Sequence, residues 1–227
     1  MLKSFSRIIL ALLNRQVVNH IDVLVFTSYG AKKTKKEQKA KTNMEKKRDI
    51  VRRGMLETFP KGGKCAEIGV WEGRFSDEIL ATTEPSELHL IDPWEYMPEF
   101  SNTGFGRKRN ADRMVEKYEQ VKEKFKDDKR VIIHRATSTD ALGKMEDGAL
   151  DWVYIDGNHN EPFISNDLKL ALKKVKSNGL IAGDDYYWGK DSGAPIKHAV
   201  NKLVEELGDK ATFERRGQQY IIRLNRA

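Results

Sequence analysis

Three carboxylates and one histidine follow two apolar runs of this sequence: Asp156, His159, Asp184 and Asp185. The first run, residues 152–155, ends at Asp156, and the second, residues 180–182, is followed by a glycine and the acidic pair. Carboxylate oxygens are preferred ligands of Mg²⁺ and Mn²⁺, and a histidine beside them can accept a proton near neutral pH. The sequence therefore predicts a metal-assisted acid–base site. Asp156, Asp184 and Asp185 are its expected metal ligands, and Asp156 and His159 its expected catalytic residues.

The residues between the two runs predict how these side chains are brought together. Apolar residues recur at helical spacing from residue 163 to residue 175, and the segment 177–179, Ser-Asn-Gly, is a helix stop. A strand, a helix and a second strand in this order form a right-handed crossover between parallel strands. Both strand ends then lie at the same edge of the sheet, where open α/β sheets bind ligands. The aromatic residues 186–188 follow the acidic pair, and they either line the acceptor site or pack in the core.

A second group of candidate residues lies at the ends of two earlier strands. The stretch EIGVWEG at residues 67–73 begins in a predicted strand, residues 65–70, and turns into a helix. Glycines there let the backbone approach a ligand, and a helix amino end offers free N–H groups. Asp92 ends a predicted strand at residues 88–91, where an acid commonly binds ribose hydroxyls. The alternative for Asp92 is a turn or capping residue.

Strands that alternate with helices predict the fold class. We expect a doubly wound, Rossmann-like α/β sheet of seven mostly parallel strands, with helices on both faces. The remaining expected elements are a strand at 131–134, helices at 111–125, 139–145 and 196–207, and an antiparallel hairpin of 212–214 with 220–224.

The amino-terminal 43 residues are predicted to be separate from a catalytic domain at residues 44–227. Residues 2–13 have the pattern of a basic amphipathic helix, which packs on its own domain, on a second subunit or on a membrane surface. Residues 32–48 contain nine Lys and Arg against two Glu, a net of +7, which equals the net charge of the whole chain. The catalytic domain is therefore formally almost neutral, which disfavours nucleic acid as its partner.

The composition also indicates the cellular compartment of the protein. A single cysteine, Cys65, excludes an internal disulfide and a cysteine-based zinc site, and it favours a reducing compartment. No segment approaches the roughly 20 apolar residues that span a bilayer. We therefore expect a cytoplasmic protein, in peripheral contact with a membrane if the amino-terminal helix binds lipid.

The motifs EIGVWEG, LIDPW, DWVYIDGNHN and GLIAGDDY together resemble the class I S-adenosylmethionine-dependent methyltransferases, over about residues 48–224. They are most similar to the macrocin-type sugar O-methyltransferases, with a metal arrangement similar to that of catechol O-methyltransferase. The resemblance implies transfer of a methyl group from S-adenosylmethionine to a hydroxyl of a small molecule or a sugar, assisted by Mg²⁺ or Mn²⁺.

The resemblance also implies cofactor contacts. The first motif holds the methionine part and the acid after the second strand holds the ribose, whereas residues after the third strand flank the adenine. The residues in these places are Glu67, Gly69, Gly73, Asp92, Ala136, Thr137 and Ser138, with Asp156 beside the cofactor. One departure is Glu161, which stands where many relatives carry a tyrosine, in the pattern DGxHxY. It puts any substrate or packing role of that tyrosine in doubt, and it leaves the metal residues untouched.

Three alternatives stay open at this point. A nicotinamide-dependent oxidoreductase can use a similar sheet, but the glycine spacing is GxxxG rather than GxGxxG. A nucleic-acid-directed methyltransferase would use the basic segment, but DGNH stands where base methyltransferases carry an Asn-Pro-rich motif. A membrane-surface or partner-binding protein that uses residues 1–48 on an inert scaffold would leave the acidic residues and His159 without a role.

Overall fold

The computed structural model describes residues 47–101 and 103–226. The predictions for residues 1–43, an amphipathic helix and a basic linker, lie outside this range. The described part begins with a helix at residues 47–56, which buries Met55 and Leu56. Among the described residues, no helix combines the length and the apolar character needed to cross a membrane.

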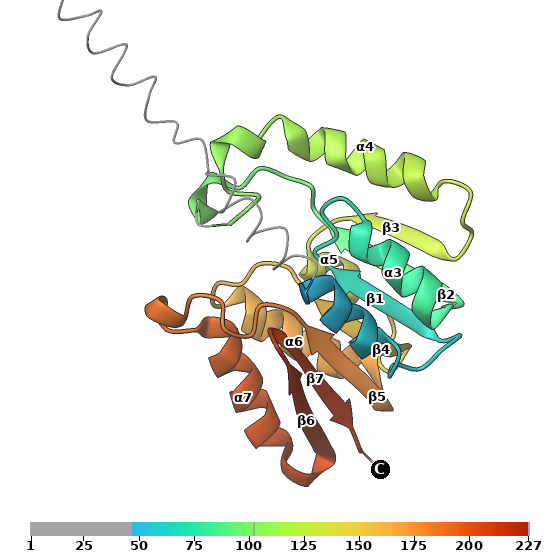
Figure 1. Cartoon of the computed structure of the whole chain (residues 1–227), viewed down its shortest axis with the longest axis vertical. Helices are drawn as coiled ribbons and strands as arrows, with labels where there is room; N and C mark the ends of the chain where they lie inside the picture. Colours follow the sequence, from blue (N-terminus) through green and yellow to red (C-terminus); the bar gives the residue numbers. More distant parts are fainter. Residues whose placement is uncertain (1–46, 102, 227) are drawn as a thin grey trace, which may run out of the picture. The chain divides into compact units, whose positions relative to one another are not determined.

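Within the described part, seven strands form one sheet in the order β3-β2-β1-β4-β5-β7-β6 (Figure 1). The strands are β1 (Lys64–Ile68), β2 (Glu87–Asp92), β3 (Val131–Arg135), β4 (Leu150–Ile155), β5 (Val175–Gly183), β6 (Ala211–Arg216) and β7 (Gln219–Leu224). The first five pair in parallel, whereas β7 pairs antiparallel with both β5 and β6. This arrangement confirms the predicted doubly wound, mostly parallel sheet with a closing hairpin.

Helices cover both faces of the sheet (Figure 1). They are α3 (Arg74–Thr83), α4 (Arg113–Phe125), α5 (Ser138–Gly143), α6 (Phe163–Lys174) and α7 (Pro195–Leu207), with short 3-10 turns η1 (Pro98–Phe100), η2 (Lys108–Asn110), η3 (Lys190–Ser192) and η4 (Gly208–Lys210). One apolar cluster packs the helix at residues 47–56, α3 and α4 on one face. A second cluster packs α5, α6 and α7 on the other. Both faces are thus buried, as parallel strands require.

The strand order reverses between β1 and β4, and this reversal places the candidate residues. Ile68 and Ile155 are register partners, and the Asp156 backbone N–H donates to the Ile68 carbonyl at 2.7 Å. Gly69 follows with φ +87°, and a Cβ on it would lie 2.1 Å from the Asp156 carbonyl oxygen. Only glycine fits this approach. In open α/β sheets, such a reversal opens a crevice in which ligands bind.

One element differs from the sequence prediction. The expected helix stop at residues 177–179 is wrong, because β5 begins directly after α6 and runs through this segment. Residues 176–178 are exposed, and the pairing of β5 with β4 shifts register between Leu150 and Trp152. Polar residues and a glycine at an exposed, irregular strand start have the composition of a turn, which explains the error.

Candidate active site

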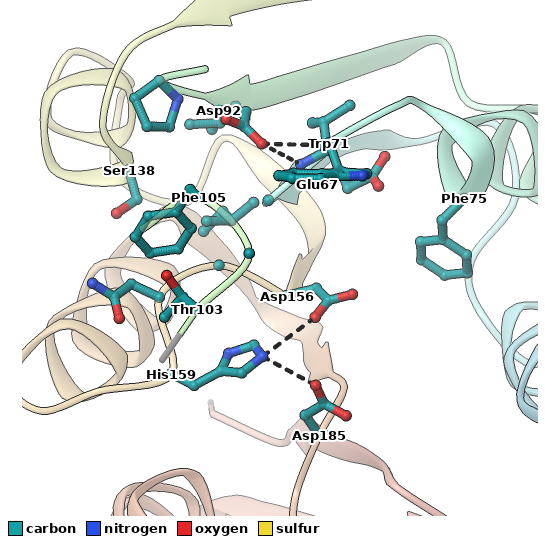
Figure 2. A pocket seen from close by; sticks show the side chains of 18 of the residues that line it. Glu67, Trp71, Phe75, Asp92, Thr103, Phe105, Ser138, Asp156, His159 and Asp185 are labelled. Atoms are coloured by element: carbon teal, nitrogen blue, oxygen red, sulfur yellow. Dashed lines mark hydrogen bonds and ion pairs between the residues drawn. The ribbon is translucent and has the colours of Figure 1, made fainter. Parts of the chain in front are cut away.

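A cavity of about 860 Å³ lies at the carboxyl ends of β1, β2 and β4. Its lining comes from segments far apart in the chain, including residues 67–72, 91–93, 103–105, 137–139 and 156–159. Figure 2 shows Asp92 and Trp71 near one end, and Asp156, His159 and Asp185 near the other. The volume lies within the range of about 300–1,000 Å³ that is usual for ligand pockets.

Three of the four residues predicted for the metal-assisted site meet at one wall of this cavity. Of the described residues, Asp156, His159 and Asp185 form a group whose possible ligand atoms lie within 4.8 Å of one another. His159 Nε2 lies 3.0 Å from Asp185 Oδ2 and 3.9 Å from Asp156 Oδ1 (Figure 2). Asp156 follows β4, His159 precedes α6, and Asp185 follows β5 in the left-handed region at φ +56°. A backbone held in this region is a feature of functional sites.

The three side chains perturb one another's ionisation. Removal from water raises the pKa of Asp156 to about 7, against the lowering effect of nearby Arg52. Burial would raise the pKa of Asp185 too, but the hydrogen bond and charge of His159 outweigh it and lower that pKa. Burial opposes the charged form of His159, yet the hydrogen bond to Asp185 and the carboxylate charges raise its pKa. Two carboxylates shielded from water beside an imidazole form a donor set that fits a divalent cation.

Asp184, the fourth predicted residue, lies behind this group. Its side chain is 1% exposed and accepts hydrogen bonds from the Asp185 backbone N–H at 2.7 Å and from Gln219 Nε2. The Tyr154 hydroxyl in turn donates to Gln219 Oε1 at 2.5 Å. In this arrangement the Asp184 carboxylate belongs to a buried network between β4, β5 and β7. Its role as a metal ligand stays a prediction.

Arg52, which the sequence analysis did not single out, connects the two acidic positions. Its Nη2 donates to Asp156 Oδ2 at 2.7 Å and also to Asp184. Arg52 is 8% exposed and lies one turn before Met55 and Leu56, on the buried face of the helix at residues 47–56. An arginine on an apolar helical face was the signal that could have drawn attention to it.

Asp92 organises the opposite end of the cavity. Its Oδ2 accepts the backbone N–H groups of Val70 and Trp71, each at 3.0 Å, and its Oδ1 accepts that of Trp94 at 2.7 Å. Trp71 and Trp94 both have positive φ, at 57° and 43°. Asp92 thus holds the loop after β1 against the end of β2. Its Oδ1 accepts one of these donors and has room for a second, such as a ribose hydroxyl.

Glu67 lies on β1 beneath this loop and lines the cavity. Its side chain is 2% exposed and accepts a hydrogen bond from the Ser76 hydroxyl at 2.5 Å. Burial raises the pKa of Glu67 to about 8, although this hydrogen bond and the charge of Arg52 act in the opposite direction. A cationic ligand group such as an ammonium would favour the ionised form of Glu67, so this buried carboxyl group suits such a ligand.

The remaining predicted cofactor residues differ in their positions. Gly69 and Thr137 line the cavity, and the Thr137 hydroxyl caps α5 by accepting the Asp140 N–H at 3.2 Å. Gly73 is outside the lining found in the described part, and a Cβ on it would lie 2.9 Å from the Phe125 ring.

Ser138 also lines the cavity, and its hydroxyl donates to Asp167, a buried residue of α6 that the sequence analysis did not single out. Burial raises the pKa of Asp167 to about 6. The sequence feature that could have pointed to Asp167 was a carboxylate next to Leu168 on the apolar face of a predicted helix.

Aromatic residues line the cavity around His159. The Trp188 ring lies 5.2 Å from the His159 ring in an edge-on arrangement, and Phe105 and Phe163 also line the cavity. Tyr186, in contrast, is buried in the core. Of the aromatic residues 186–188, Tyr186 therefore packs in the core and Trp188 lines the cavity, whereas Tyr187 is 37% exposed.

Comparison with known proteins identifies the family. Residues 66–186 match the model of a family described as a methyltransferase domain. This match covers more than half of the chain, so the protein belongs to that family of methyltransferase domains. No curated protein sequence is significantly similar to it.

Solved structures show the same fold. A "putative caffeoyl-CoA O-methyltransferase" from Staphylococcus aureus has a TM-score of 0.55 at 10% identity, over 91% of this chain and 99% of that one. The O-methyltransferase NovP has a TM-score of 0.54 at 19% identity, over 81% and 80% of the two chains. An rRNA methylase from Streptococcus thermophilus has a TM-score of 0.51 at 9% identity, over 76% and 93%.

The fold and the family together define a class I methyltransferase that depends on S-adenosylmethionine. This confirms the class predicted from the sequence motifs. It also decides against the nicotinamide-dependent oxidoreductase.

Proposed function

We propose that this protein is an O-methyltransferase that transfers the methyl group of S-adenosylmethionine to a hydroxyl of a small molecule or a sugar, with assistance from a divalent cation. The observation that carries the proposal is the convergence of Asp156, His159 and Asp185 on the wall of the cavity that also contains Glu67 and Asp92. Two of the structural neighbours are named as O-methyltransferases, which supports the same chemistry.

The cavity has the two ends that such a reaction needs. At one end, Asp92 and Glu67 offer acceptors for the ribose and the ammonium group of the cofactor. S-adenosylmethionine, when bound, supplies a methyl group whose transfer breaks one S–C bond and forms one C–O bond. Because this displacement is in-line, the protein contributes mainly alignment and a deprotonated acceptor oxygen. The aromatic lining near His159, including Trp188, can pack on the apolar face of an acceptor ring.

His159 acts as the base that removes the proton of the acceptor hydroxyl. The imidazole lines the cavity and is oriented by Asp185 at 3.0 Å, so that a hydroxyl placed against it can give up its proton. Asp156 and Asp185 are the carboxylates that would hold a divalent cation. The cation, when bound, would lower the pKa of a nearby acceptor hydroxyl.

His159 could serve instead as a third metal ligand, and the two roles exclude each other because a neutral imidazole has only one free lone pair. If His159 is the base, His159→Ala leaves the affinity for Mn²⁺ within about twofold of the wild type and removes turnover. If it is a ligand, the same variant loses affinity by a factor of about 10 or more. Titration of both proteins with Mn²⁺ by calorimetry separates the roles.

The function itself is tested with S-adenosylmethionine carrying a labelled methyl group. The full-length protein is incubated with pools of sugars, hydroxylated small molecules and RNA, and labelled products are identified by mass. We expect label on a hydroxyl oxygen of a small molecule or sugar, and loss of labelling with excess chelator. Label that appears only on RNA, or turnover unchanged in chelator, would contradict the acceptor or the metal assignment respectively.

A further inference from the structure

The two carboxylate oxygens of Asp156 face different partners. Its Oδ1 faces His159 at 3.9 Å, whereas its Oδ2 accepts a hydrogen bond from Arg52 at 2.7 Å. The same Arg52 Nη2 also donates to Asp184. The guanidinium therefore occupies a position between two strand-end carboxylates, and this is a position in which a divalent cation could also bind.

Both oxygens of Asp184 accept hydrogen bonds from described residues, and Arg52 covers the side of Oδ2 that faces Asp156. Asp184 Oδ1 accepts the Asp185 N–H and Gln219 Nε2, and its Oδ2 accepts Arg52. The Oδ2 could reach a cation only if Arg52 withdrew. The group that can hold a metal accordingly contains Asp156, His159 and Asp185, without Asp184.

Arg52 is not fully satisfied where it lies. Its Nε is buried and has no hydrogen-bond partner within the described part of the chain. An unpaired buried N–H is unfavourable, since it loses its hydrogen bond to water without replacement. One guanidinium also balances only one of the two carboxylate charges. A doubly charged cation can therefore compete with Arg52 for these two carboxylates.

Arg52 has a place to pack beside this position. Its guanidinium lies 4.9 Å from the centre of the Phe75 ring and 5.9 Å from that of Tyr154. Phe75 lines the same cavity. Cation–π contact with these rings can retain the side chain when it leaves the carboxylates.

We propose that Arg52 is an internal counter-ion that competes with a divalent cation for Asp156 and Asp184 and thereby sets the metal affinity of the site. The proposal rests on the metal site of the proposed function. With Arg52 in place, a metal has Asp156 Oδ1 and Asp185 as its carboxylate ligands. When Arg52 withdraws, Asp184 Oδ2 and Asp156 Oδ2 become available, and the site gains a third carboxylate.

The experiment measures Mn²⁺ binding to the full-length protein by calorimetry and by the electron paramagnetic resonance signal of free Mn²⁺. We expect Arg52→Gln to bind Mn²⁺ at least tenfold more tightly than the wild type, because the competing charge is gone. Arg52→Lys keeps a positive charge and should stay within threefold of the wild type. The matched control is Arg53→Gln, since Arg53 is exposed and pairs only with Glu78, at 2.8 Å, in the described structure.

Equal or weaker Mn²⁺ binding by Arg52→Gln would overturn the proposal, and so would a comparable gain in Arg53→Gln. The binding readout is independent of the proposed function. If Arg52→Gln gains Mn²⁺ affinity but wild-type turnover survives chelator, then the competition stands and the metal-assisted reaction fails. If wild-type turnover is lost in chelator but Arg52→Gln binds Mn²⁺ no more tightly than the wild type, then the metal-assisted reaction stands and the competition fails.

A second measurement does not depend on the folding of Arg52→Gln. In the wild type, the Nε–H signal of Arg52 can be followed by nuclear magnetic resonance and assigned by its loss in Arg52→Lys. We expect this signal to shift as Mg²⁺ saturates the site, because the guanidinium leaves its carboxylates. A signal that stays unchanged at saturating Mg²⁺ would show that Arg52 does not exchange with the metal, which overturns the proposal.

Discussion

His159 Nε2 lies 3.0 Å from Asp185 Oδ2, although 26 positions separate the two residues in the chain. The pairing follows from the parallel arrangement of β4 and β5, whose carboxyl ends lie side by side. It orients the imidazole toward the cavity and gives the two residues different tasks. Asp185 positions the ring and can hold a cation, whereas His159 can accept a proton.

These different tasks predict different behaviour of two variants. His159→Ala should lower kcat by a factor of about 10²–10⁴, the usual contribution of a general base, with little change in cofactor affinity. Asp185→Asn should lower the affinity for the cation, and added Mg²⁺ should partly restore its turnover. Steady-state kinetics across a range of Mg²⁺ concentrations check both. Restoration of His159→Ala by Mg²⁺ would show that His159 is a ligand rather than the base.

Asp92 is expected to support the cofactor in two ways, through the ribose and through the loop that it holds. Asp92→Ala removes three acceptor contacts to Val70, Trp71 and Trp94. We expect S-adenosylmethionine binding to weaken by about 1–3 kcal/mol, the scale for loss of buried polar partners. Calorimetric titration checks this, with Asp128→Ala as a control, because Asp128 pairs with Arg130 in a distant turn. Unchanged affinity in Asp92→Ala would remove Asp92 from the cofactor site.

Gly69 is expected to be irreplaceable for steric reasons. A Cβ there would lie 2.1 Å from the Asp156 carbonyl oxygen, and the residue has φ +87°. Gly69→Ala should therefore destabilise the fold by roughly 3 kcal/mol or more, from backbone strain and overpacking together. The control is Gly143→Ala, since a Cβ there would meet no described atom within 4 Å apart from its chain neighbours and the backbone of its own helix. Denaturant unfolding of both variants measures the difference, and a stable Gly69→Ala would mean that β1 and β4 can separate.

Glu67 is expected to make stability depend on pH. Its pKa rises from 4.5 to about 8 on folding, so the native state binds this proton more tightly than the unfolded state. The stabilising contribution is complete below pH 4.5 and is lost as pH rises through about 8. A shift of this size corresponds to a loss on the order of 3–5 kcal/mol.

The measurement compares the free energy of unfolding at pH 5 and pH 9 in the wild type and in Glu67→Gln. Glutamine can still accept the hydrogen bond from Ser76, so the variant keeps this contact without the charge. The wild type should lose more stability than the variant between the two pH values. Equal losses would show that Glu67 does not titrate in this range.

Residues 1–43 are expected to control location or assembly rather than chemistry. A chain of residues 44–227 should retain cofactor binding and turnover, because Glu67, Asp92, Asp156, His159 and Asp185 all belong to this segment. Attraction of basic residues to anionic lipid is worth about 1 kcal/mol per Lys or Arg and weakens with salt. Sedimentation with anionic vesicles, at low and high salt, compares the full and shortened chains. Loss of turnover in a folded shortened chain would contradict this division.

The sequence by itself determined which residues stand at the strand ends. The apolar runs at β1, β2, β4 and β5 each end at a glycine or an acid, and helices between them require parallel strands. Parallel strands place their carboxyl ends at one edge, so Glu67, Asp92, Asp156 and Asp185 had to lie near one crevice. The start of β5 was not predictable in this way, because its exposed first residues look like a turn.

Only the tertiary structure decided how the side chains at that edge are oriented and paired. Arg52 reaches Asp156 and Asp184 across 104 and 132 positions, and no local pattern encodes such a partner. Asp184 and Asp185 are adjacent, yet one accepts Gln219 in a buried network and the other faces the cavity. The left-handed φ of Asp185 and the packing of β7 on β5 separate them. Strand periodicity determines on which face of the sheet a side chain lies. The groups that its charge contacts are determined by residues far away in the sequence.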